Sequence, residues 1–161
     1  MINKLIAVIG REAELFETFL DLLEQQQRML VKNDLKGLTE VTSQQQEKLI
    51  VSQNLNRHRL ELVEAIKRDR QLEGDLNVTR LIEIVDREQA DRLSLLQKII
   101  LNLTDKINET RNQNALLLNR SREYIVKTVE MLARINSPKT GYTSGGVTED
   151  TRDNLALDRR A

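Results

Sequence analysis

The chain has 161 residues, enough for one domain, or one domain with a tail, but not for two separate hydrophobic cores. Its 25 lysine and arginine residues equal its 25 aspartate and glutamate residues, so no net field favours nucleic acid or an anionic membrane surface as a partner. Cysteine is absent, which excludes disulfides and thiolate metal sites, and aromatic residues make up only 2% of the chain, as is typical of long-helix bundles.

The first predicted helix covers residues 2–31. The short apolar run at its start is no signal peptide, because Arg11 and Glu12 follow it at once, so we interpret it as the first turns of this helix. Apolar residues recur every three or four positions, the spacing of one buried helix face. They are Ile2, Leu5, Ile9, Ala13, Phe16, Leu20, Leu23 and Leu30.

The second predicted helix covers residues 34–70 and begins at Asp34, a residue type that caps helix amino termini well. Gly37 in the first turn lowers helix propensity by about 1 kcal/mol relative to alanine. The expected inward stripe is more polar in its middle than at its ends. It consists of Leu35, Leu38, Val41, Gln45, Leu49, Ser52, Asn56, Leu60, Val63 and Ile66.

A turn follows at residues 71–75, where Gly74 can adopt a positive φ that other residues resist. A short helix is predicted over 77–85 and a long one over 86–136. Asp86 and Gln89 have the spacing of a capping box, in which each side chain satisfies the amide of the other.

The long helix carries a continuous stripe that becomes more apolar toward its end. A second apolar line lies beside it, formed by Leu118, Ile125, Val129 and Leu132. Two interpretations remain open: this end packs against two neighbouring helices, or it presents an apolar face to a partner helix. The main stripe consists of Leu93, Leu96, Ile100, Leu103, Ile107, Thr110, Asn114, Leu117, Ser121, Tyr124, Thr128, Met131 and Ile135.

These elements predict an all-α fold, an elongated antiparallel three-helix coiled-coil bundle with a long third helix and a flexible C-terminal tail. The bundle would comprise residues 1–136, and residues 137–161 would form a disordered or partly helical tail. No stretch reaches the roughly 18 uninterrupted apolar residues of a membrane span. We therefore expect a cytoplasmic protein that does not insert into membranes.

The residues that could carry chemistry do not form a site. His58 is the single histidine and cannot build a zinc site, while Asp86, Glu88 and Asp91 lack the glycine and spacing of a calcium loop. Residues 141–148 contain two glycines five apart but have Val147 where a phosphate-binding loop needs lysine. We predict no catalytic, metal or cofactor site, and no enzyme.

The polar tail contains an isolated aromatic residue, Tyr142, and a short apolar segment with Leu155 and Leu157. An aromatic side chain in such a tail can anchor it to a partner, because it provides a large contact area with few rotamers to freeze. Tyr142 is either a docking residue or part of a spacer.

The chain resembles the FlgN flagellar export chaperones over essentially its whole length. The resemblance rests on residues 114–118 (Asn-Ala-Leu-Leu-Leu), on Tyr124-Ile125 and Met131-Leu132, and on residues 140–145 (Thr-Gly-Tyr-Thr-Ser-Gly). The closing residues 157–161 (Leu-Asp-Arg-Arg-Ala) and the step from Met29-Leu30 to Asp34 are also similar to the family pattern.

The resemblance implies a cytoplasmic chaperone that holds the hook-filament junction proteins FlgK and FlgL before export. It implies that a client's terminal helical region packs on the last helix, and that Tyr142 contacts the export gate protein FlhA. Client-binding candidates are Leu118, Ile125, Val129, Leu132, Leu155 and Leu157. The chaperone is expected to be a monomer or weak homodimer. The alternative is a self-associating structural coiled coil without a client.

Overall fold

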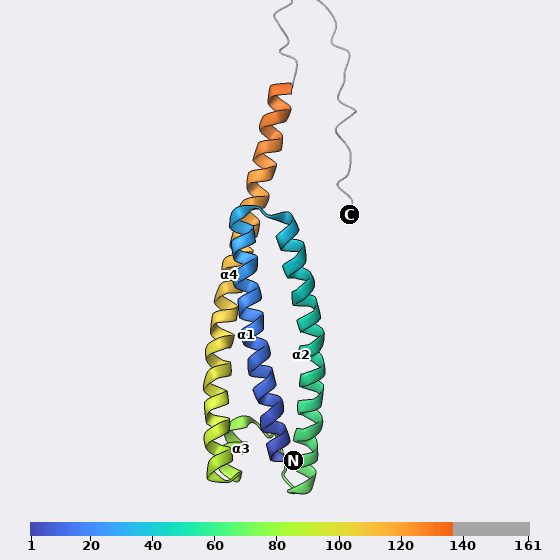
Figure 1. Ribbon diagram of the computed structural model, residues 1–161, viewed down its shortest axis with the longest axis vertical. Coiled ribbons are helices and arrows are strands. Elements are labelled where there is room, and N and C mark those ends of the chain that lie inside the picture. Colours follow the sequence, from blue (N-terminus) through green and yellow to red (C-terminus); the bar gives the residue numbers. More distant parts are fainter. Residues whose placement is uncertain (137–161) are drawn as a thin grey trace, which may run out of the picture. The chain divides into compact units, whose positions relative to one another are not determined.

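The computed structural model describes residues 1–136, which form four α-helices and no strand (Figure 1). The all-α class predicted from the sequence is confirmed for these residues. The chain divides into two compact units, Met1–Ile125 and Val126–Ala161, and residues 126–136 are the described part of the second. The helices are α1 (Ile2–Lys32), α2 (Leu35–Asp69), α3 (Val78–Ile84) and α4 (Arg87–Asn136), where the sequence pattern predicted 2–31, 34–70, 77–85 and 86–136.

The connection between α1 and α2 is two residues long. Asn33 adopts a left-handed conformation (φ 55°), and its amide donates to the Leu30 carbonyl at 3.3 Å, which closes the last turn of α1. The Asp34 carboxylate caps α2 by accepting from the Gly37 amide at 2.9 Å. A Cβ at Gly37 would lie 2.6 Å from the Asp34 carboxylate, so glycine leaves room for the cap despite its low helix propensity. The tight turn makes α1 and α2 antiparallel neighbours (Figure 1).

The connection from α2 to α3 contains two residues with positive φ. Gly74 has φ 79°, as its place in the predicted turn required, and Gln71 has φ 52° without any local signal in the sequence. The Asn77 side chain caps α3 by accepting from the Arg80 amide at 2.8 Å. The Arg80 guanidinium donates to the Glu73 carbonyl at 2.7 Å, and this hydrogen bond fixes the turn against α3.

The start of α4 is tied to the start of α1. Asp86 accepts from the Gln89 amide at 2.8 Å, which confirms it as the cap. The Gln89 side chain does not complete the predicted capping box. It donates instead to the Asn3 side chain at 2.9 Å, because α1 offers a partner that a local pattern cannot reveal.

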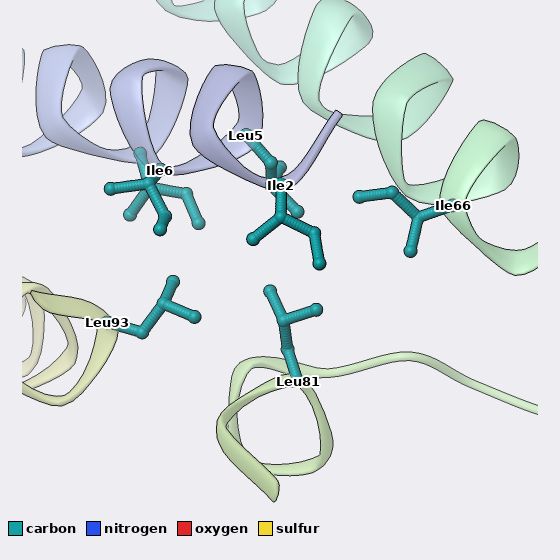
Figure 2. Close-up of a cluster of buried hydrophobic side chains, with 7 residues drawn as sticks. Ile2, Leu5, Ile6, Ile66, Leu81 and Leu93 are labelled. Atoms are coloured by element: carbon teal, nitrogen blue, oxygen red, sulfur yellow. The ribbon is translucent and has the colours of Figure 1, made fainter. Parts of the chain in front are cut away.

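All four helices of the first unit contribute to one apolar cluster (Figure 2). Figure 2 shows Ile66 from α2, Leu81 from α3 and Leu93 from α4 pointing toward the side chains at the start of α1. Leu93 is fully buried, and Ile66 and Leu81 are 1% and 2% exposed. Each such side chain contributes about 1.5–3 kcal/mol by leaving water. The buried members are Ile2, Leu5, Ile6, Ile9, Ile66, Leu81 and Leu93.

In the first unit, α4 runs parallel to α1. Side-chain hydrogen bonds join them at successive levels, and the two partners are always 86 to 91 residues apart in the sequence. A nearly constant separation means that the two helices advance together. The bonded pairs are Asn3–Gln89, Leu23–Asn114, Gln26–Asn114 and Gln27–Gln113.

The predicted inward stripe of α2 is wrong at its first residue, Leu35, which is 77% exposed, and again in the middle of the helix. Leu49 and Leu60 are 52% and 51% exposed, and Asn56 is exposed as well. The buried residues of α2 are Val41 and Ile66, which lie roughly 100° around the helix from Leu49 and Leu60 at 3.6 residues per turn. Packing at these two ends sets the rotation of the helix, and the apolar residues between them are turned outward.

Candidate functional site

The predicted stripe of α4 lies on the buried side of the first unit as far as Ser121. Every stripe position from Leu93 to Ser121 is buried or half-buried. Tyr124, the next stripe position, is 73% exposed. Ser121 also contacts the α1–α2 connection through a 3.5 Å hydrogen bond to the Asn33 side chain. Within this unit, the stripe of α4 is therefore buried only as far along the helix as the level of the α1–α2 connection.

A polar layer precedes this point. Asn114 is 5% exposed, and its side-chain amide donates to the Leu23 carbonyl at 2.9 Å and to the Gln26 side-chain oxygen at 3.0 Å. Beside it, the Gln27 amide donates to the Gln113 side-chain oxygen at 2.9 Å. Hydrogen bonds thus join α1 and α4 at this level, where Leu23 and Leu30 of α1 are also buried, and an apolar cluster joins them at the other end of the unit.

Apolar side chains of α4 are exposed next to the polar layer. Leu116, Leu118 and Ile125 are 60%, 56% and 59% exposed. For Leu118 and Ile125, the alternative of packing against neighbouring helices is therefore not realised in the first unit. Leu118 and Ile125, seven residues apart, share one face of α4, whereas Leu116 lies on the opposite side of the helix. Burial would be favourable for such side chains, and exposed apolar side chains on one face are typical of a surface that a partner covers.

The described residues of the second unit are the last turns of α4, and their apolar side chains are also exposed. Val129 and Leu132, the two predicted candidates among them, are 59% and 55% exposed. Val126 and Met131 are exposed as well, at 51% and 62%. The sequence interpretation did not name Val126, and it placed Met131 on the main stripe rather than on the partner surface. In the sequence, their exposure is indicated by the density of apolar residues over 125–135, which exceeds what one buried helix face requires.

Three predicted site residues lie outside the described residues. They are Tyr142, Leu155 and Leu157. The glycine-containing segment 141–148 lies outside them too.

Two residues that the sequence analysis considered as metal ligands, His58 and Asp86, are both exposed in the structure. His58 lies on α2, and Asp86 is engaged as the cap of α4. Within residues 1–136 no three histidine, cysteine, aspartate or glutamate side chains gather as a metal site would require. In the same range, no helix combines the length and the apolar character needed to span a bilayer.

Comparison with known proteins gives one family. The model of the FlgN family, described as FlgN protein, matches residues 1–150, which is most of the chain. Neither a curated protein nor a solved structure matches the chain.

Proposed function

The chain belongs to the FlgN family, and on this premise we propose that it is a cytoplasmic chaperone of flagellar type III export. FlgN proteins form a chaperone family rather than an enzyme family, and membership suggests a flagellar export chaperone. In our proposal the clients are the hook-filament junction proteins FlgK and FlgL. The chaperone prevents their premature association and delivers them to the export gate protein FlhA.

The observation that carries this proposal is the exposure of apolar side chains on α4. Leu118, Ile125, Val129 and Leu132 have the spacing of one helix face and are each more than half exposed. Junction proteins that assemble through helical ends need their apolar helix faces covered until export. The apolar face of α4 can cover the apolar face of a client helix by packing against it. We propose that these four residues contact the client.

A paired substitution tests the contact. Ile125→Asp with Val129→Asp places two carboxylates on the proposed face, and we expect affinity for a terminal helical fragment of FlgK or FlgL to fall about 100-fold or more. The matched control is Asn112→Asp with Asn119→Asp, which adds the same charge at two exposed positions of α4 roughly 120° away from that face. Unchanged affinity in the first variant, with its helix content intact, would refute the contact.

Delivery is proposed to depend on Tyr142, which would dock on the gate while the client is held. Tyr142→Ala should abolish binding of the chaperone–client complex to the FlhA cytoplasmic domain and leave client affinity unchanged. Tyr142→Phe is the control, because it keeps the ring and its contact area. Normal gate binding by the alanine variant would remove Tyr142 from the proposal.

We further propose that residues 1–136 form an antiparallel three-helix coiled coil and that residues 137–161 act as a tail whose Leu155 and Leu157 add to client binding. A variant ending at Asn136 should bind the client more weakly than the full chain. The protein would be a monomer or weak homodimer. The competing function is a self-associating structural coiled coil, in which a second copy covers the same exposed face, and the molar mass in solution separates the two.

A further inference from the structure

The middle of α2 turns polar side chains toward α1. Within residues 42–61, between the buried residues Val41 and Ile66, the half-buried positions are mainly polar, whereas the apolar residues Leu49 and Leu60 are about half exposed. A helix that packs stably on a core instead turns its apolar side chains inward and its polar side chains outward. The half-buried positions at the spacing of the inward face are Gln45, Lys48, Ser52, Leu55 and Arg59.

This arrangement leaves a polar group without compensation. The Gln45 side-chain nitrogen is buried and has no hydrogen-bond partner in the described part of the chain. A buried polar group without a partner costs about 1–3 kcal/mol of desolvation. The packing of this segment is therefore weak, since little apolar burial offsets that cost.

One ion pair holds the segment to α1. The Arg59 guanidinium donates to the Glu12 carboxylate at 3.0 Å, with the two side chains 36% and 15% exposed. Among residues 1–136 this is the one side-chain hydrogen bond between α1 and α2. Beside it lies a groove of about 330 Å³ with an apolar floor and a polar rim supplied by α2. The floor includes Ile9, Phe16 and Ile100, and the rim includes Ser52, Asn56 and Arg59.

We propose that residues 42–61 of α2 are a flap that opens from α1 by local unwinding and closes again, while the ends of the helix stay packed. Val41 and Ile66 keep the two ends in place, and the Glu12–Arg59 pair latches the closed state. Opening exposes the apolar floor of the groove and returns the Gln45 side-chain nitrogen to water. Regions with few buried apolar contacts open locally at much lower free energy than the core. The flap goes beyond the chaperone proposal and does not depend on any client.

Hydrogen exchange of the isolated full-length protein, resolved by peptide, tests the flap. Amides of residues 45–60 should exchange on the order of tenfold faster than those of residues 62–69 of the same helix, whose side chains pack on the core. Gln45→Leu replaces the unsatisfied amide by an apolar group and should slow exchange over 45–60 on the order of tenfold. Gln44→Leu, at the exposed neighbouring position, is the matched control and should leave it unchanged.

The latch is tested in the same experiment. Glu12→Ala removes the ion pair and should speed exchange over 45–60 severalfold, whereas Glu14→Ala, at an exposed position of α1, should not. Equal protection along the whole of α2 in the unaltered protein would overturn the flap. So would a Gln45→Leu variant that exchanges like its Gln44→Leu control. Neither result would bear on client binding, which is measured separately.

Discussion

Replacing Asn114 with alanine tests whether hydrogen bonds contribute to holding α4 against α1 next to the exposed apolar face. Asn114 is 5% exposed and donates at 2.9 Å to the Leu23 carbonyl and at 3.0 Å to the Gln26 side chain. Alanine removes both bonds. Each contributes about 0.5–1.5 kcal/mol net. Alanine also removes the Asn114 side-chain oxygen, which is buried without a partner among the described residues, and this offsets part of the loss. The free energy of unfolding should therefore fall by about 1–2 kcal/mol.

Urea unfolding followed by circular dichroism measures this loss. For a chain of this length, each kcal/mol also lowers the melting temperature by roughly 2–4 °C, which gives a second readout. Asn112→Ala is the control, because Asn112 is exposed two residues away on the same helix, and its effect should stay within about 0.5 kcal/mol. If the two alanine variants were equally stable, the reasoning that the polar layer joins α1 and α4 would be refuted.

Three further predictions concern the first unit and use the same unfolding assay. Leu93→Ala, at a fully buried position, should cost about 2–5 kcal/mol, whereas Leu95→Ala, 60% exposed, should cost under about 0.5 kcal/mol; equal effects would contradict the assignment of the core. Asp34→Ala should cost about 1 kcal/mol by removing the cap of α2, and Asp34→Asn, which still offers an oxygen, should retain most of it. Gly74→Ala should cost about 1 kcal/mol because φ there is 79°, and no loss would mean that the turn adopts another conformation.

The comparison of α4 with α2 explains how much of the fold the sequence could predict. On α4 the stripe from Leu93 to Ser121 is buried as predicted, since its periodicity is regular and its partner, α1, has a matching apolar face. On α2 the stripe is weak in the middle, so periodicity alone cannot set the rotation. Val41, Ile66 and the Glu12–Arg59 pair decide it, and Glu12 lies off the predicted stripe of its own helix.

The contacts that position the candidate surface could not be predicted because they join residues distant in the sequence. Asn114 was part of the predicted inward stripe, yet its partners Leu23 and Gln26 lie 91 and 88 residues away. The apolar excess near the end of α4 did predict the exposure of Leu118 and Ile125 as one of two alternatives. Local patterns reveal how apolar a face is, whereas the neighbouring helices determine whether it is covered.

The central claim, that this chain holds a flagellar junction protein, is tested most directly by size-exclusion chromatography with light scattering. The full chain and a variant ending at Asn136 would each be mixed with the terminal helical region of FlgK or FlgL. We predict a discrete complex of defined molar mass with the full chain, and weaker binding without residues 137–161. Large homo-oligomers with no complex for either client would contradict the chaperone proposal and favour the structural coiled coil.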